Sequence, residues 1–294
     1  MWTLLVKRRH SHHDLPWLPP AELVSIPGRG EIFVRRFSHP NPDATTLVLL
    51  HGWTGTGDIN FFSAYEQLAE KYSFVVVDHR GHGRGPRPAE KFTLEDCADD
   101  VAAIVRELGI SDVTAVGYSM GGPISMLLWK RHRALVRSIV LCATALEWNG
   151  TKAERRRWKT SRVISPLIRM LSTPRIIERV VHRAIPHNSA MHRHVSWIVS
   201  EIRRNDSWVM REAGRALSTY SAVDWAGQVD VPVACVVTTS DVLVPPRKQH
   251  QLASATSAHV VPLDGDHLAM WGVPDRYATA LRMAVDWTTS ISTR

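Results

Sequence analysis

The sequence Gly-Tyr-Ser-Met-Gly-Gly at residues 117–122 decides the fold. It follows an apolar, β-branched run at residues 112–116 and precedes a helical pattern at residues 120–132. Glycines two positions before and two positions after a serine leave room for a sharp strand-to-helix turn, which lifts the hydroxyl above the end of the strand. We therefore predict that Ser119 is a nucleophile. The alternative is a glycine-rich turn with an incidental serine.

A serine hydroxyl needs a neighbouring base before it can attack a carbonyl at neutral pH. Among the fifteen histidines, His267 stands out because it comes just after the last predicted strand, beside a glycine. Asp241 follows the apolar run at residues 231–237, and we predict that its carboxylate orients the imidazole. Asp264 and Asp266 are rivals, but residues so close to the histidine in sequence generally cannot fold back onto its ring.

The tetrahedral intermediate of acyl transfer needs hydrogen-bond donors where its oxyanion forms. We expect one to be the backbone N–H of Met120, the residue after the nucleophile. The second is expected to be the N–H of Trp53, in the glycine-rich loop His-Gly-Trp-Thr-Gly-Thr-Gly at residues 51–57. A phosphate-binding loop is the competing interpretation, but this loop lacks the Gly-Lys-Ser/Thr ending.

Short apolar runs alternate with helical patterns along most of the chain. A hairpin is predicted at residues 22–37, and further strands at 46–50, 73–77, 112–116, 136–142, 231–237 and 259–263. Helical spacing occurs at residues 61–71, 93–108, 120–132 and 275–289. This alternation predicts an α/β fold with a mostly parallel central sheet flanked by helices.

Residues 147–222 break the alternation, since they hold several amphipathic helical stretches and no convincing strand. We predict an irregular lead-in at residues 1–21, a core formed by residues 22–146 and 223–294, and a helical cap insertion at residues 147–222. Tryptophans and aliphatic residues of the cap could line an acyl pocket or pack against the core, and both interpretations stay open. The candidate substrate-binding residues are Trp148, Trp158, Trp197 and Trp208.

Positive charge is concentrated in residues 151–217, which hold fifteen Lys and Arg against five Asp and Glu in a chain of net charge +8. Such a segment is either a solvated helical surface or a site that attracts anionic lipid or acidic substrates. No nucleic-acid-binding module is recognisable, so we expect no nucleic-acid partner.

The apolar start, residues 1–6, is too short for a secretory signal, and no apolar run approaches the roughly 20 residues that span a bilayer. We expect a soluble, cytoplasmic protein, with membrane association through the basic cap as an alternative. The cysteines Cys97, Cys142 and Cys235 have no metal-binding spacing. We expect neither a metal nor a cofactor, and the oligomeric state is open.

Together these motifs resemble those of the α/β-hydrolase superfamily, in the form of a capped serine hydrolase. Residues 51–53 resemble its oxyanion loop, residues 117–121 its nucleophile elbow, and residues 241–245 its Asp-x-x-Val-Pro acid motif. Residues 78–85 resemble its Asp-x-Arg-Gly-x-Gly-x-Ser turn, which in the family mostly shapes the core, with glycine as the last residue here. The acid motif usually opens with a glycine, and Thr-Thr-Ser at residues 238–240 takes that place.

The resemblance implies a carboxylesterase- or lipase-like serine hydrolase that cleaves esters of small to medium acyl groups through an acyl-enzyme. The alternatives are a lipase, lysophospholipase or thioesterase at a membrane surface, a cofactor-free haloperoxidase-like activity, or a non-catalytic binding module, because one fold supports many functions. The intact set of three residues favours an enzyme. Haloalkane dehalogenases and epoxide hydrolases of this family use an aspartate nucleophile, so Ser119 argues against both.

Overall fold

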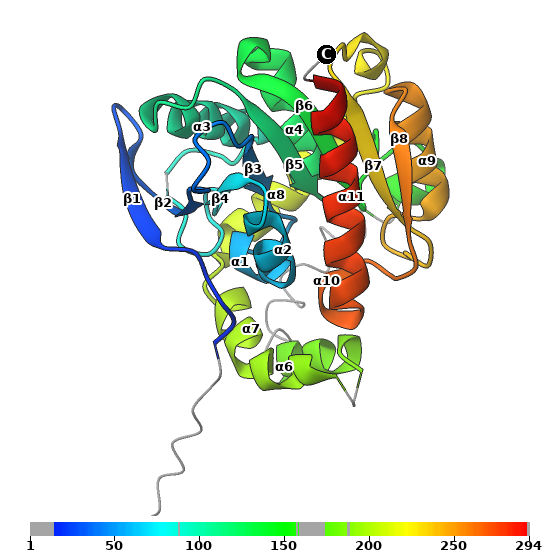
Figure 1. Cartoon of the computed structure of the whole chain (residues 1–294). Helices are drawn as coiled ribbons and strands as arrows, with labels where there is room; N and C mark the ends of the chain where they lie inside the picture. Colours follow the sequence, from blue (N-terminus) through cyan, green and yellow to red (C-terminus); the bar gives the residue numbers. More distant parts are fainter. Residues whose placement is uncertain (1–14, 88, 157, 159–173, 187–188, 293–294) are drawn as a thin grey trace, which may run out of the picture.

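The computed structural model describes residues 15–87, 89–156, 158, 174–186 and 189–292 (Figure 1). Its centre is an eight-stranded sheet with the strand order β1-β2-β4-β3-β5-β6-β7-β8. Strands β1 and β2 are antiparallel to each other, and β2 is antiparallel to β4, whereas all other neighbours are parallel. The predicted mostly parallel sheet is therefore confirmed. The strands are β1 (Ala21–Ile26), β2 (Gly30–Phe37), β3 (Thr46–Leu50), β4 (Ser73–Val77), β5 (Val113–Tyr118), β6 (Val136–Cys142), β7 (Val233–Thr238) and β8 (His259–Leu263).

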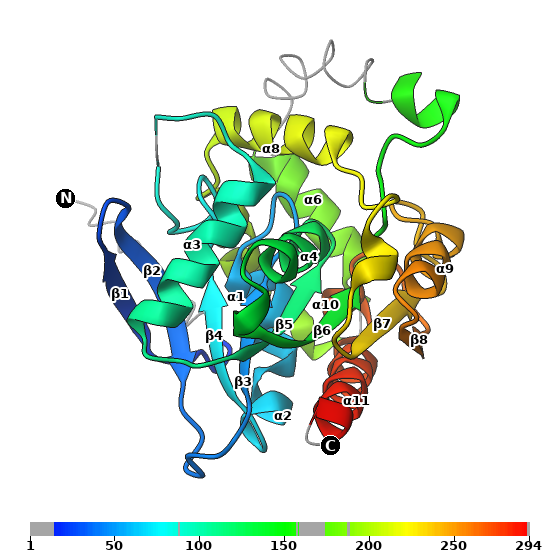
Figure 2. The ribbon, with the colours of Figure 1, turned by 90° about the horizontal axis from the view of Figure 1, so that it is seen from above.

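Helices cover both faces of the sheet, as Figure 2 shows from above. One face carries α3 (Leu94–Glu107), α4 (Gly121–Arg131) and α9 (Pro246–Ala255). The other face carries α1 (Gly57–Phe61), α2 (Tyr65–Ala69), α10 (Ala269–Gly272) and α11 (Pro274–Ser292). Short 3-10 segments lie at η1 (Phe62–Ala64), η2 (Arg133–Leu135) and η4 (Ala226–Gln228).

Strand β3 shows why the central strands are mostly apolar. Val48 and Leu50 belong to the apolar cluster on one face, and Leu47 and Leu49 belong to the cluster on the other face. All four side chains are fully buried. Successive strand residues point to opposite faces, so a sheet that is covered on both sides needs an uninterrupted apolar run.

The segment predicted as a cap leaves the core after β6 and returns before β7. Its two ends meet, because Glu147 and Ser221 form an isolated antiparallel bridge and the N–H of Ala222 donates to the Leu146 carbonyl at 2.9 Å. Residues 157, 159–173 and 187–188 of this segment lie outside the described residues. The predicted domain boundaries stay a prediction. The named elements of the segment are α6 (Pro174–Ala184), η3 (Ala190–His194), α7 (Val195–Ile202) and α8 (Ser207–Thr219).

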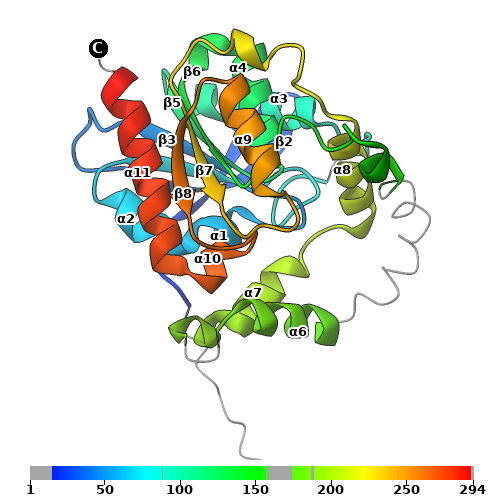
Figure 3. The same cartoon turned by 90° about the vertical axis from the view of Figure 1, so that its right-hand side faces the viewer.

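The described helices of the segment pack against different parts of the core. Helix α8 places Val209, Ala213 and Leu217 in the cluster that also contains α3 and α4. Helices α6 and α7 lie below α10 in Figure 3, and they place Val181, Val195 and Ile198 in the cluster of the other face. Within the described part of the chain, no helix is both long enough and apolar enough to cross a membrane.

Three buried histidines gather where β3 and β4 end. The ring centroids of His79 and His82 lie 4.4 and 5.0 Å from that of His51. The Nε2 atom of His51 accepts a hydrogen bond from the His79 backbone N–H at 3.0 Å, so its proton is on Nδ1, which donates to the Gly52 carbonyl at 2.8 Å. Burial lowers the pKa of His51 to about 4 and the pKa values of the other two well below the usual range.

These histidines couple folding to pH. Each imidazole binds a proton more readily in the unfolded chain, so the stability it contributes is present above the unfolded pKa and is lost as the pH falls below it. For His51 the loss amounts to about 3 kcal/mol between pH 6.5 and about pH 4. Asp58 has the opposite effect on stability. Burial raises the pKa of this carboxyl to about 6, so the folded protein binds this proton more readily than the unfolded chain does. The dependence of the unfolding free energy on pH therefore contains both effects.

Replacing one ring isolates the histidine contribution. His79→Phe keeps an aromatic ring at a site where Nε2 has no hydrogen-bond partner among the described residues. When the pH falls from about 7 to about 5, we expect the unfolding free energy of the variant to rise relative to that of the wild type, because the phenyl ring takes up no proton in the unfolded chain. Urea denaturation at the two pH values measures this gain. His250→Gln, at an exposed position, should show no such gain, and a pH-independent difference for His79→Phe would contradict the account.

Candidate active site

Three of the predicted site residues meet at one edge of the sheet. Ser119 follows β5, Asp241 follows β7 and His267 follows β8, and the carboxyl ends of these parallel strands lie at the same edge. The Ser119 Oγ atom lies 3.0 Å from His267 Nε2, and His267 Nδ1 lies 2.7 Å from Asp241 Oδ2. The fold therefore joins side chains separated by 148 and 26 positions in one hydrogen-bonded chain.

The backbone at Ser119 has a φ of 52°, in the left-handed region that residues other than glycine rarely adopt. Hydrogen bonds hold this turn. The Ser119 N–H donates to the Cys142 carbonyl at 2.8 Å, and the Ser119 carbonyl accepts from Thr144 Oγ1 at 2.8 Å and from the Gly122 N–H at 2.9 Å. Strained conformations persist where the surroundings fix them. The side chain is consequently presented at the top of the turn between β5 and α4.

The glycines around Ser119 are required by close backbone contacts. A Cβ on Gly117 would lie 2.2 Å from the carbonyl oxygen of Gly121, and a Cβ on Gly121 would lie 1.9 Å from that of Leu50. Neither position can accept a side chain without moving the backbone. The glycine spacing that predicted the turn therefore has a direct steric cause.

The carboxylate of Asp241 is buried and well supplied with donors. Its Oδ1 atom accepts from the backbone N–H groups of Leu243 and Val244 at 2.8 and 2.9 Å. Its Oδ2 atom accepts from Thr238 Oγ1 at 3.0 Å as well as from the imidazole. These donors hold the carboxylate in one orientation, with Oδ2 toward the imidazole. Asp241 can thus stabilise a positive charge on the imidazole.

Sequence reasoning missed two residues that orient Asp241. Thr238, at the place where the family pattern has glycine, bonds the carboxylate directly. Gln249, from α9, donates through Nε2 to Thr238 Oγ1 at 2.8 Å and to the Val244 carbonyl at 2.7 Å. The departure at residue 238 was a signal in the sequence, whereas nothing marked Gln249.

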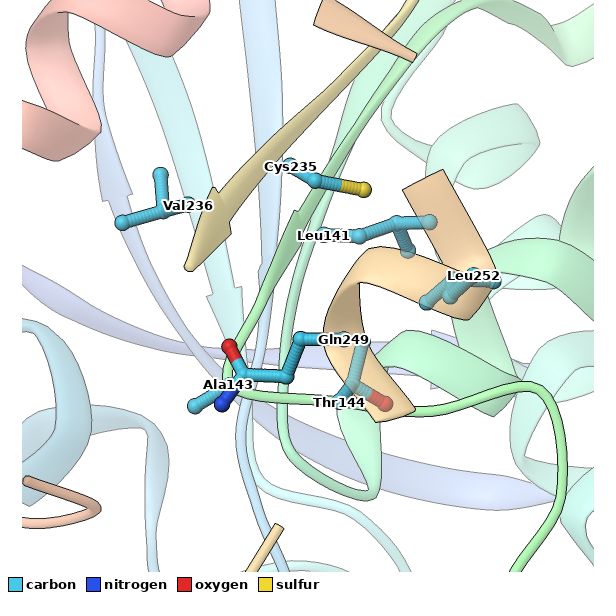
Figure 4. A pocket seen from close by; sticks show the side chains of 7 residues that line it. All are labelled: Leu141, Ala143, Thr144, Cys235, Val236, Gln249 and Leu252. Atoms are coloured by element: carbon cyan, nitrogen blue, oxygen red, sulfur yellow. The ribbon is translucent and has the colours of Figure 1, made fainter. Parts of the chain in front are cut away.

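Figure 4 shows the Gln249 side chain reaching from its helix across a narrow gap toward Ala143. The gap holds about 130 Å³ of empty space, too narrow for a water molecule, and offers no room for a substrate. Its lining residues are Leu141, Ala143, Thr144, Cys235, Val236, Gln249 and Leu252.

The two rival carboxylates have other partners. Asp264 is exposed and forms an ion pair with Arg276 at 2.8 Å. Asp266 accepts a hydrogen bond from the Leu268 N–H at 2.8 Å and so closes the turn after the histidine. Among the three aspartates, only Asp241 contacts the imidazole of His267 in the described structure.

The loop after β3 lies directly against the serine. A Cβ on Gly52 would be 3.1 Å from the Cβ of Ser119. The N–H of Gly52 donates to Asn60 Oδ1 at 2.8 Å, and its carbonyl accepts from His51 Nδ1 and from the Gly55 N–H at 2.8 and 3.1 Å. These bonds fix the peptide plane between residues 52 and 53 from its carbonyl side.

The backbone N–H groups of Trp53 and Met120 donate to no acceptor among the described residues. The N–H of Trp53 belongs to the same peptide as the Gly52 carbonyl, and the two groups of a trans peptide point in opposite directions. His51 holds the carbonyl on one side of this peptide. The N–H therefore points to the other side, where it can bind another acceptor. Both expected oxyanion donors are therefore unpaired beside Ser119.

The four tryptophans predicted to contact substrate lie in different surroundings. Trp158 has its ring 6.0 Å from that of Trp53, and its Nε1 donates to the Trp148 carbonyl at 2.7 Å. Trp197 is buried against Phe62 of the core, with ring centroids 5.0 Å apart. The fourth, Trp208, is 40% exposed on α8. The structure thus brings Trp158, with Trp148 beside it, to the loop after β3 that contains Trp53.

Two apolar side chains at the site were not predicted to contact substrate. Val242 and Leu243 follow Asp241 directly and are 78% and 55% exposed. Exposed aliphatic residues beside a reactive group are candidates for contact with an apolar ligand. No group of three or more His, Cys, Asp or Glu side chains that could hold a metal ion occurs among the described residues.

Comparison with known proteins agrees with this fold. A model of the family described as "alpha/beta hydrolase fold" matches residues 45–273. An esterase from Exiguobacterium antarcticum superposes with a TM-score of 0.77 at 17% identity, covering 92% of this chain and all of that one. An enol-lactonase from Burkholderia xenovorans LB400 superposes with a TM-score of 0.75 at 21% identity, covering 91% of this chain and all of that one. At these identities the likeness concerns the fold.

Curated relatives match over shorter stretches. The AB hydrolase superfamily protein YisY of Bacillus subtilis is 31% identical over 115 residues, which are 39% of this chain and 41% of that protein. The bifunctional esterase/perhydrolase DCH of Acinetobacter calcoaceticus is 36% identical over 80 residues, or 27% of this chain and 29% of that protein. The chain thus covers less than two thirds of these relatives' length. The family model spans most of the sequence, and the chain belongs to the α/β-hydrolase family.

Proposed function

We propose that the protein is a serine hydrolase that cleaves carboxylic esters of small to medium acyl groups through an acyl-enzyme intermediate. The observation that carries this proposal is the continuous hydrogen-bonded chain from Ser119 Oγ through His267 to Asp241. The two unpaired N–H groups beside the serine support it, because a hydrolase needs donors where the oxyanion forms.

The reaction follows from these positions. The Ser119 oxygen attacks the ester carbonyl carbon while His267 Nε2 takes its proton, and the carbonyl oxygen, now negative, accepts hydrogen bonds from the Trp53 and Met120 N–H groups. The imidazolium, stabilised by Asp241, then donates its proton to the departing alcohol oxygen, and the acyl group stays on Ser119. A water molecule, deprotonated by the same imidazole, releases the carboxylic acid and restores the serine.

The apolar side chains near the site favour an uncharged acyl group. Trp158 lies beside the ring of Trp53, and Val242 and Leu243 are exposed next to the acid. The esterases among the relatives and structural neighbours support an ester substrate, and the enol-lactonase among the neighbours makes a cyclic ester a related candidate. Thioesters react by the same steps. A haloperoxidase-like activity and a non-catalytic binding role are the remaining alternatives.

Hydrolysis of a p-nitrophenyl ester series from acetate to palmitate tests the proposal. We expect the highest kcat/KM on short to medium chains. Ser119→Ala should lower kcat by at least about a thousandfold because the nucleophile is lost, and Asp241→Asn by about ten-thousandfold because the imidazole adopts the wrong tautomer.

Asp264→Asn is the matched control, since this carboxylate has the same chemistry and does not contact the imidazole, and its activity should equal that of the wild type. Undiminished hydrolysis by Ser119→Ala would contradict the proposal. A clear optimum at palmitate would instead indicate a true lipase.

A second candidate, action at an anionic membrane surface, is favoured by the outer face of α6. Arg175, Arg179 and Arg183 are exposed at intervals of one helical turn, next to Ile176 and Val180, which are 38% and 54% exposed. Arginines beside exposed aliphatic residues are typical of helices that lie in a lipid interface. Helix α6 lies on the outside of the molecule, away from the sheet (Figures 1 and 3).

Sedimentation with lipid vesicles tests this second candidate. The protein should bind vesicles that contain phosphatidylserine, bind pure phosphatidylcholine vesicles weakly, and be released by salt. Reversing Arg175, Arg179 and Arg183 to Glu should abolish binding, because each basic residue near the surface contributes about 1 kcal/mol.

The control variant replaces Arg203 and Arg211 by Glu. Both arginines are exposed elsewhere in the predicted cap, and this variant should still bind the phosphatidylserine vesicles. If the wild type binds both lipid compositions equally, or the α6 variant binds like the wild type, α6 is not a lipid-binding surface.

A further inference from the structure

The turn between α7 and α8 contacts two loops at the edge of the sheet where Ser119 lies. The side-chain amide of Asn205 bridges them, because Nδ2 donates to the Thr54 carbonyl at 2.7 Å and Oδ1 accepts from the Gly83 N–H at 2.8 Å. The next residue, Asp206, donates its backbone N–H to the Gly81 carbonyl at 2.9 Å. A residue of the predicted cap thus holds the loop that carries the proposed oxyanion donor.

Thr54 lies in this loop in an unfavourable conformation. Its φ is 64°, and a β-branched residue in the left-handed region is a true outlier. The Gly55 N–H closes a turn onto the Gly52 carbonyl, and a positive φ at this position of a turn normally requires glycine. Such strain persists only where neighbours fix the backbone. The bond from Asn205 to the Thr54 carbonyl supplies this restraint, one residue after the Trp53 N–H.

The turn that carries Asn205 is itself firmly anchored. Glu201, at the end of α7, is buried and accepts two hydrogen bonds from the Arg84 guanidinium, at 2.7 and 2.8 Å. Arg87 donates to the Arg204 carbonyl at 2.9 Å. Paired charge-assisted bonds of this kind define position and orientation together. These bonds fix the position of Asn205 relative to residues 83–87 even without the hydrogen bonds of its own side chain.

The Trp53 side chain makes a second connection to the same segment. Its Nε1 donates to the Met210 carbonyl of α8 at 2.8 Å. A Cβ on Gly214 would lie 2.7 Å from the Trp53 ring, so the ring packs against a helix surface that only glycine leaves open. The loop that carries the expected donor is thus attached at two points. The Trp53 side chain binds α8, and the Thr54 carbonyl binds the turn between α7 and α8.

We infer that Asn205 is a positioning residue for the oxyanion hole, which makes the segment between β6 and β7 a structural part of the catalytic machinery. Asn205 acts through Thr54 and reaches no reacting atom. It keeps the strained turn in the conformation that points the Trp53 N–H toward the oxyanion. This inference rests on the proposed function, since it assigns Asn205 a role in that same reaction.

Asn205→Asp separates the two bonds of the bridge. The carboxylate still accepts from the Gly83 N–H but has no proton to donate to the Thr54 carbonyl. We expect the acylation rate and kcat for p-nitrophenyl acetate to fall about tenfold to a hundredfold, because a misplaced donor stabilises the transition state less. KM and the amplitude of the acylation burst, which counts correctly folded sites, should stay close to the wild-type values. Ser207→Ala, at an exposed neighbouring position, is the control and should change neither rate.

A second substitution tests whether the effect passes through Thr54. Glycine adopts a positive φ without strain, so Thr54→Gly should restore much of the activity lost in Asn205→Asp, although neither change brings back the hydrogen bond. A kcat for Asn205→Asp within twofold of the wild type would overturn the inference. So would a loss that appears only as a smaller burst amplitude, or one that Thr54→Gly leaves unrepaired.

Failure of the proposed function gives a different result. In that case the wild-type protein itself shows neither a burst nor turnover with any ester of the series, and the inference falls with the proposal. If the wild type hydrolyses the ester and the Asn205→Asp variant does so equally fast, the proposed function stands and only the role assigned to Asn205 is refuted.

Discussion

The geometry of the site follows from the left-handed turn at Ser119. Its φ of 52° places the hydroxyl above the sheet, and the close approach of Gly121 to the Leu50 carbonyl fixes β3 and β5 as neighbours. The loop at residues 51–57 follows β3 and therefore lies against the serine. The start of α4 provides the Met120 N–H at the same point. One strained residue thus aligns the proposed nucleophile with both expected donors.

The surroundings of the turn supply the charge and the rigidity that hydrolysis needs. Asp241 is buried and bonded on both oxygens, so it can hold His267 in one tautomer and stabilise its protonated form. On the opposite side, His51 fixes the peptide that carries the Trp53 N–H. Polar groups fixed before the substrate arrives need no reorganisation during the reaction. The predicted cap adds a further restraint through Asn205.

Features set by residues close together in the sequence could be predicted, whereas features set by distant partners could not. Strands such as residues 46–50 and 73–77 were predicted with their observed bounds, because burial on both faces imposes a nearly continuous apolar run. Residues 61–71 were predicted as one helix, whereas the structure has α1, η1 and α2 there, beginning after Thr56, which caps α1. Gln249 and Asn205 were not foreseen, since their roles depend on partners distant in sequence. Helical spacing could not separate Trp158, beside the oxyanion loop, from Trp197 in the core.

The central claim is that His267 activates the Ser119 hydroxyl toward an electrophile, and a fluorophosphonate probe followed by peptide mass spectrometry tests it most directly. The probe transfers its phosphonyl group to an activated serine oxygen with loss of fluoride. We expect a single adduct, on the peptide that contains residue 119, formed in the wild type and lost when His267 is replaced by alanine. No adduct, or one that forms at the same rate without the imidazole, would contradict it.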